Sequence, residues 1–162
     1  MPSDLPVYGL GGGWVASLRD DVQYVSLHGD PRSAYPYFIG HAEETGTGRG
    51  LGSNVNLPLP RKTSDDEFTA TLVRAREAVD AFDPSVIVVS LGVDTHELDP
   101  LGDFRVTTES YETHGRLVAA LGRPLVILQE GGYHVPSLGN NIRNWLTGAS
   151  AKSAPDCSTQ VP

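Results

Sequence analysis

Short apolar runs alternate with longer amphipathic stretches along the chain, a pattern typical of alternating strands and helices. The short runs are rich in β-branched and aromatic residues and predict strands at residues 22–28, 86–91 and 125–129. Each of the last two runs stops at a loop that contains glycine. Because an unbroken apolar run is typical of a buried parallel strand, we expect residues 86–91 to be buried.

Helical spacing of apolar residues appears between and after these strands. The first helix is expected to begin near Ser64, which forms a capping box with Glu67, and to end at Pro84. Its predicted buried stripe consists of Phe68, Leu72, Ala75, Val79 and Phe82. Two further helices are expected at residues 108–121 and 136–147. Residues 29–62 contain many Gly and Pro and predict a long loop, which in a compact domain is typically functional.

The order of these elements predicts an α/β fold with a parallel sheet, right-handed crossovers and helices on both faces. Only about three strands are visible, so the sheet is expected to be incomplete. One domain is the expectation for 162 residues, and we assign it to residues 14–148. Residues 1–13 form an atypical start whose GLGGG lacks the context of a phosphate loop, and residues 149–162 a small, polar tail that is expected to be disordered.

Charge and cysteine usage narrow the possible partners and compartment. The formal net charge of −8 argues against nucleic-acid binding and favours cationic partners. A single cysteine, Cys157, excludes an internal disulfide framework and indicates a reducing compartment, so we expect a cytoplasmic location. No apolar run approaches the ~20 residues of a membrane span, so no membrane contact is expected.

Two chemically capable side chains follow the last two predicted strands, namely Asp94 and Tyr133. Since the carboxyl ends of parallel strands lie at one edge of a sheet, the two side chains are expected to converge on one crevice, where ligands bind in such sheets. A carboxylate can bind a metal and a phenol can donate a hydrogen bond to a polarised carbonyl. Gly131 and Gly132 would permit close approach of a ligand. The alternative is that Asp94 is a turn residue and Tyr133 a packed aromatic.

A family resemblance is carried by three segments. VQYVSLHGDPRSAYPYFIGHAEETGTGRGLGSNVNLPLP (22–60), VSLGVDTHELDPLGDF (89–104) and QEGGYHV (129–135) resemble the carboxyl-terminal half of a zinc-dependent deacetylase of the histone deacetylase and acetylpolyamine amidohydrolase superfamily. The resemblance covers about residues 14–148, and HGDPR and LQEGGY favour the acetylpolyamine branch. It implies a three-layer arginase/deacetylase-like fold, of which this chain holds a partial domain, truncated at its amino terminus.

The resemblance also implies roles for individual residues. Asp94 would be a zinc ligand, and Tyr133 would be the catalytic tyrosine that stabilises the oxyanion. Tyr35 and Leu101 match residues that border the substrate tunnel, which Gly131 and Gly132 also line. Ser26 and Leu27 match two ligands of a structural potassium ion, whose other ligands this chain lacks.

Half of the family's catalytic set is missing from the sequence. Neither the Asp-x-His pair nor the His-His pair that the family uses is expected anywhere in these 162 residues, and only MPSDLPVYGLGGG stands where the Asp-x-His strand should lie. Two zinc ligands and the general base are therefore absent, and the chain alone is expected to be inactive, with weak zinc binding or none. His28 and His134 are expected to make hydrogen bonds or to support the site from behind. His41, His96 and His114 are expected on the surface or in loops.

Two classes of function follow. The first is hydrolysis of acetylated amines, such as acetylpolyamines or acetyl-lysine, by a deacetylase that needs completion of its site. The second is a noncatalytic remnant or partner-binding fragment. In either case the strand at 22–28 is expected to have an exposed edge through which the chain self-associates.

Overall fold

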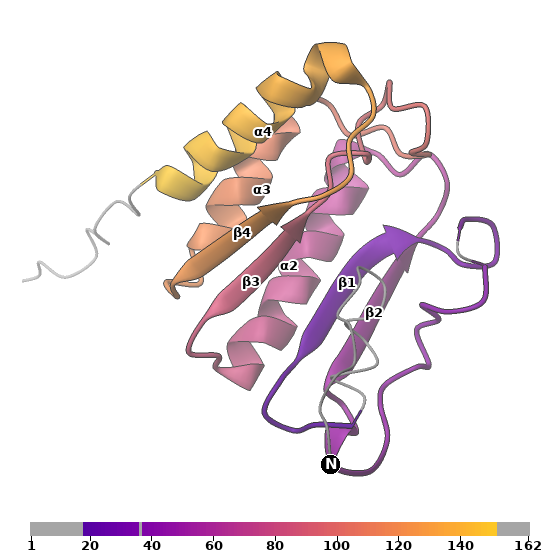
Figure 1. Cartoon of the computed structure of the whole chain (residues 1–162), viewed down its shortest axis with the longest axis vertical. Helices are drawn as coiled ribbons and strands as arrows, with labels where there is room; N and C mark the ends of the chain where they lie inside the picture. Colours follow the sequence, from indigo (N-terminus) through magenta and orange to yellow (C-terminus); the bar gives the residue numbers. More distant parts are fainter. Residues whose placement is uncertain (1–17, 36, 152–162) are drawn as a thin grey trace, which may run out of the picture.

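Four strands, three α-helices and one short 3-10 helix make up the structure, a computed structural model that describes residues 18–35 and 37–151 (Figure 1). In chain order the elements are β1 (Tyr24–Gly29), η2 (Gly48–Gly50), β2 (Asn54–Leu59), α2 (Asp65–Phe82), β3 (Ile87–Leu91), α3 (Ser110–Ala119), β4 (Leu125–Gln129) and α4 (Val135–Ser150). The predictions for residues 1–13 and for residues 152–162 lie outside the described residues.

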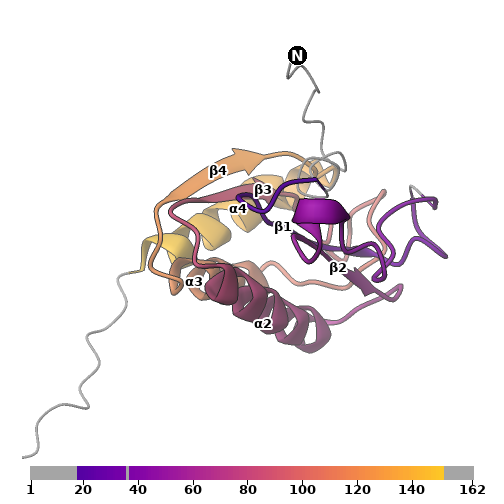
Figure 2. The ribbon, with the colours of Figure 1, turned by 90° about the horizontal axis from the view of Figure 1, so that it is seen from below.

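The strands form two parallel pairs. β1 pairs with β2 from Tyr24↔Asn54 to Gly29↔Leu59. β3 pairs with β4 from Ile87↔Leu125 to Leu91↔Gln129. Figures 1 and 2 both show the two pairs side by side, with β1 next to β3, yet no strand ladder joins them within the described part of the chain. Among residues 18–35 and 37–151, the edge of β1 that faces β3 and the edge of β3 that faces β1 have no strand partner.

The sequence pattern predicts one long loop over residues 29–62, but the structure contains β2 within this range. Its sequence, NVNLPL, contains Asn and Pro, which are poor strand formers. Pairing with β1 overrides this local preference. The buried Asn54 and Asn56 donate from Nδ2 to the carbonyls of Glu44 and His41, so the loop also anchors the strand.

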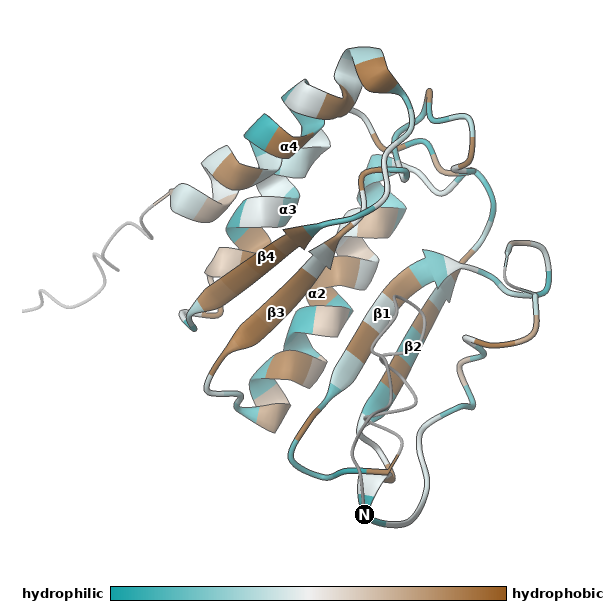
Figure 3. Ribbon diagram, viewed as in Figure 1, coloured by the Kyte–Doolittle hydropathy of each residue, from teal (hydrophilic) through white to brown (hydrophobic). Residues whose placement is uncertain are grey.

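All three α-helices lie on one side of the strands (Figure 2), and the core forms between these two layers. The layered α/β arrangement is therefore the predicted one, and within the described residues the helices cover one face of the incomplete sheet. Side chains on the opposite face of β3 and β4 are exposed: Val88 by 59%, Val126 by 47% and Leu128 by 51%. Figure 3 shows β3 and β4 largely in brown, because most of their residues are apolar. The core itself is built by Leu59, Leu91, Val93, Phe104, Val106, Tyr111 and Trp145.

Helix boundaries follow local signals where these exist. α2 begins after Ser64, whose hydroxyl accepts from the Glu67 N–H while Glu67 accepts from the Ser64 N–H, so the predicted capping box is confirmed. α3 begins two residues later than expected, and α4 continues to Ser150, three residues past the predicted end. Among the described residues, no helix is long and apolar enough to span a membrane.

We expect the isolated chain to self-associate at tens of micromolar. The open face of β3 and β4 exposes apolar area to water, at a cost of about 25 cal/mol per Å², and the facing edges of β1 and β3 leave N–H and C=O groups unpaired. Sedimentation velocity of the wild-type chain is expected to show dimers or larger species. Replacing Val88 and Leu128 together with lysine is expected to shift the chain toward the monomer.

The matched control is Leu51→Lys, since Leu51 is 70% exposed but lies in the loop before β2 rather than on the open face. This control is expected to leave the association unchanged. A wild-type chain that remains a cooperatively unfolding monomer would contradict the prediction.

Candidate functional site

The loops that follow β3 and β4 are tied together by the backbone. Glu130 N–H donates to Leu91 O at 3.0 Å, and Val93 N–H donates to Gly131 O at 2.9 Å. Asp94 and Tyr133 therefore stand in adjacent loops at the carboxyl ends of paired parallel strands. The backbone thus places the two residues at the same edge of the sheet, as predicted.

Glycines surround the Asp94 carboxylate and make room for it. A Cβ atom on Gly131 would lie 2.4 Å from Asp94 Oδ2, and one on Gly92 would lie 3.0 Å from Oδ1. A Cβ on Gly102 would lie 1.6 Å from the Asp94 carbonyl oxygen. Because such distances are too short for a real side chain, glycine is required at Gly131 and Gly102 if Asp94 is to keep its place.

Burial beneath these loops raises the pKa of Asp94, and the negative charges of Asp99 and Glu130 add to the rise. No side-chain donor or basic partner contacts the Asp94 carboxylate within the part of the chain that the structure describes. A half-buried carboxylate without a cation is poised to take a proton or a positively charged ligand. Asp94 also occupies a turn position, since the His96 N–H donates to Val93 O at 3.3 Å, so the turn-residue alternative is correct as far as the backbone is concerned.

Tyr111 of α3 holds the residues on either side of Asp94 through two hydrogen bonds. The buried Tyr111 hydroxyl donates to Val93 O at 3.2 Å and is hydrogen-bonded to Thr95 Oγ1 at 2.8 Å. Burial raises the pKa of Tyr111, so its hydroxyl keeps its proton. Tyr133, in contrast, has a side chain that is open to solvent, with the residue 52% exposed. Its phenol is available to a ligand rather than packed as a core aromatic.

The structure brings together two histidines that are far apart in the sequence. The rings of His96 and His134 stack with centroids 5.7 Å apart, and Ser137 Oγ lies 2.9 Å from His134 Nδ1 and 3.3 Å from His96 Nδ1. His96 is buried, so its prediction as a surface or loop side chain is wrong in respect of exposure. The supporting role predicted for His134 agrees with this network.

His96 also belongs to an Asp-x-His tripeptide, Asp94–Thr95–His96, so the prediction that no Asp-x-His occurs in the chain is wrong. Its imidazole is not free to bind a metal in this arrangement. Nδ1 accepts from the Leu98 N–H at 3.3 Å, and Nε2 lies 3.2 Å from Thr108 Oγ1. Both ring nitrogens are therefore engaged inside the protein.

His28, Ser26 and Leu27 lie on β1. His28 has Ser26 Oγ 2.7 Å from Nδ1 and Gly40 O 2.8 Å from Nε2, so the predicted hydrogen-bonding role of His28 is confirmed. The Ser26 hydroxyl is thus hydrogen-bonded to His28, and Leu27 packs against the core. The potassium role of Ser26 and Leu27 remains a prediction.

The two predicted tunnel residues are on exposed loops. Tyr35 is 79% exposed and contacts Tyr37 edge-to-face, with ring centroids 6.4 Å apart. Leu101 is 71% exposed in the loop after β3. Both side chains are open to solvent, and their tunnel role remains a prediction.

The residues present do not form a complete metal site. Among the described residues, no group of three or more His, Cys, Asp or Glu side chains is arranged to hold a metal ion. Zinc in proteins takes three or four protein ligands, and Asp94 supplies one. The described part of the chain therefore does not fit zinc by itself.

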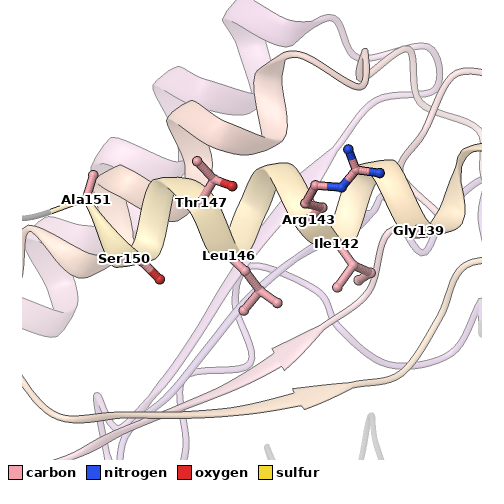
Figure 4. Close-up of a pocket in the computed structure, with 7 residues that line it drawn as sticks. All are labelled: Gly139, Ile142, Arg143, Leu146, Thr147, Ser150 and Ala151. Carbon is pink, nitrogen blue, oxygen red and sulfur yellow. The ribbon is translucent and has the colours of Figure 1, made fainter.

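A shallow groove runs along α4, away from these residues. Figure 4 shows Ile142 and Leu146 pointing from α4 toward the strands, and none of its lining residues belongs to the candidate site. The lining residues are Gly139, Ile142, Arg143, Leu146, Thr147, Ser150 and Ala151.

Parallel strands with a carboxylate and a phenol at their carboxyl ends define part of an α/β domain with a candidate site at one edge of its sheet. Residues 8–149 match the histone deacetylase domain family. The chain belongs to this family.

Relatives with known names support the same assignment. The acetylpolyamine amidohydrolase of Mycoplana ramosa is 47% identical over 132 residues, which are 82% of this chain and 39% of that protein. Acetylpolyamine amidohydrolase 1 of Pseudomonas aeruginosa is 44% identical over 80% of this chain and 38% of its own length. The chain thus spans about two fifths of the length of these relatives.

Solved structures confirm the arginase/deacetylase-like fold. The crystal structure of an acetylpolyamine aminohydrolase from Burkholderia pseudomallei superposes with a TM-score of 0.81 at 44% identity, covering 83% of this chain and 40% of that one. A histone deacetylase homologue complexed with SAHA gives a TM-score of 0.78 at 32% identity, covering 85% of this chain and 38% of that one.

Proposed function

We propose that this chain supplies the Asp94 and Tyr133 side of an amide-hydrolysing site, in a deacetylase that acts on acetylated amines. One observation carries the proposal: the Asp94 carboxylate lies in a space lined by glycines, directly against Gly131, which is two residues before Tyr133. Membership of a metal-dependent deacetylase family supports it.

Within this function Tyr133 acts as a hydrogen-bond donor. During attack on an amide carbonyl, negative charge develops on the carbonyl oxygen, and a phenol aimed at that oxygen stabilises the charge. The exposed Tyr133 side chain at the edge of the sheet is suited to this contact. Asp94 contributes the carboxylate that faces the same edge.

A general base must come from outside the described residues. His96 has both ring nitrogens engaged inside the protein, and His134 Nδ1 is hydrogen-bonded to Ser137, so we assign the general base to the rest of the fold. We therefore infer that the site becomes active only when it is joined to the rest of the fold, and that the chain alone does not turn over substrate.

Acetylpolyamines are the favoured substrates, with acetyl-lysine as the alternative. Two relatives are named acetylpolyamine amidohydrolases. The net charge of −8 favours approach of a polycation. A partner-binding role without catalysis is the second candidate, and the open apolar face of β3 and β4 favours it.

The test is complementation. The chain is purified alone and also co-expressed with the part of the Mycoplana ramosa relative that it does not match. Hydrolysis of acetylated polyamine and of an acetyl-lysine peptide is then measured with added zinc. We expect activity only in the complex, abolished by Asp94→Ala and lowered roughly 10²- to 10³-fold by Tyr133→Phe.

Tyr24→Phe is the control, because Tyr24 begins β1 and is not one of the candidate-site residues, and it is expected to keep full activity. A complex that forms but hydrolyses neither substrate would instead favour the partner-binding role. Turnover by the chain alone would refute the requirement for completion.

A further inference from the structure

We propose that Asp99 is the residue that positions Tyr133. The effect of Asp99 on catalysis depends on the proposed function of Tyr133, whereas the hydrogen bonds that Asp99 accepts do not depend on it. Asp99 is 8% exposed and lies in the loop after β3, 34 residues before Tyr133. It is not one of the site residues that the sequence pointed to.

Four backbone N–H groups converge on the Asp99 carboxylate. Oδ1 accepts from Leu101 at 3.0 Å and from Gly102 at 3.1 Å. Oδ2 accepts from Tyr133 at 2.6 Å and from His134 at 3.1 Å. Each oxygen has two lone pairs, so these donors use the full accepting capacity of the group. One side chain therefore joins the loop that carries Asp94 to the loop that carries Tyr133.

The Tyr133 loop needs such an anchor because glycine precedes it twice. Gly132 adopts a φ of +142°, which only glycine adopts with ease. The phenol itself is exposed. The direction in which the side chain leaves the loop is thus set by the backbone at Tyr133 and His134, which is where Asp99 binds.

Charge makes this anchor strong. Burial alone would raise the pKa of Asp99, but the backbone donors at Tyr133, Leu101, His134 and Gly102 outweigh it and lower the pKa. Hydrogen bonds to a carboxylate are stronger than those between neutral groups. Asparagine has almost the same shape but only one accepting oxygen, and its NH₂ group would face two N–H donors.

The test is hydrogen–deuterium exchange of the full chain at low micromolar concentration, read by mass spectrometry. In Asp99→Ala, amides in the peptide covering residues 130–138 are expected to exchange roughly tenfold faster or more, as are those in 97–103. In Asp99→Asn at least one of the two peptides is expected to do so. Peptides from α2 and β2 are expected to keep wild-type exchange.

A second readout separates positioning of Tyr133 from general loosening. With fluorotyrosine incorporated, the fluorine resonance of Tyr133, identified by its loss in Tyr133→Phe, is expected to shift in both Asp99 variants while that of Tyr111 stays. Asp103→Asn is the control, since Asp103 is in the same loop but pairs with Arg61, and it is expected to leave the Tyr133 resonance unchanged.

Unchanged exchange at 130–138 with an unchanged Tyr133 resonance would overturn the proposal. So would loss of the whole fold in both Asp99 variants, because Asp99 would then hold the core rather than the loop. Neither readout uses catalysis, so the proposal for Asp99 and the proposed hydrolysis can fail separately.

Discussion

Replacing Gly115 or Gly148 with alanine is expected to lower the free energy of unfolding by about 3 kcal/mol or more. The two glycines lie where α3 crosses α4. A Cβ on Gly115 would lie 2.0 Å from Trp145 O, and one on Gly148 would lie 1.9 Å from Glu112 O. These obstacles are backbone atoms, so a rotamer change cannot relieve the overlap and the helices must move apart.

Separation of the two helices would also loosen the core, because Trp145 is buried at this crossing and is 4% exposed. Urea unfolding followed by circular dichroism measures the loss. The matched control is Gly139→Ala in α4, where an added Cβ meets nothing within 4 Å. That variant is expected to gain about 0.5–1 kcal/mol from helix propensity.

If Gly115→Ala and Gly148→Ala were as stable as Gly139→Ala, the close crossing of α3 and α4 would be wrong. Both variants lie away from Asp94 and Tyr133 along the chain, so they test the support of the site and not its chemistry.

The parts of the fold that were predictable carry local signals. β4 begins and ends where the apolar run LVILQ does. α2 was located by its capping box at Ser64, since this contact joins residues three positions apart. The parallel arrangement followed from the alternation of elements, and it was enough to bring Asp94 and Tyr133 to one edge.

The parts that were missed depend on contacts between distant residues. β2 contains Pro58 and two asparagines, and only pairing with β1 makes it a strand. β3 reads as a strand buried on both faces, yet Val88 is exposed because no described helix covers that side. Asp99 resembles an ordinary turn residue in the sequence, and its partners at Tyr133 and His134 lie 34 and 35 positions later.

His114 is the clearest correction among the histidines. It was expected on the surface or in a loop, but it lies in α3, is 2% exposed and has Nε2 3.1 Å from Thr69 Oγ1. Phe68 packs on its ring, with centroids 4.9 Å apart. A polar residue on the buried stripe of a helix gives no sequence signal unless its partner on another helix is known.

This burial predicts a loss of stability in mild acid. Burial lowers the pKa of His114 from 6.5 to about 4, although the Asp65 charge acts in the opposite direction. Between these values the unfolded chain binds a proton that the folded chain does not, so stability is complete above pH 6.5 and falls as the pH drops toward 4. The contribution of His114 over this range is roughly 3 kcal/mol.

Asp94 has the opposite effect, because its pKa is raised in the folded chain. As the pH falls, protonation of Asp94 relieves the cost of burying its charge and so raises stability. The difference between the wild-type chain and His114→Gln therefore isolates the histidine. Chemical unfolding at pH 7, 5.5 and 4.5 is expected to show a steeper loss in the wild type than in His114→Gln. Thr69→Val, which removes the hydrogen-bond partner but keeps the imidazole, is expected to lose stability at every pH and to retain the wild-type slope. Equal slopes in the wild type and His114→Gln would mean that His114 is not held neutral between α2 and α3.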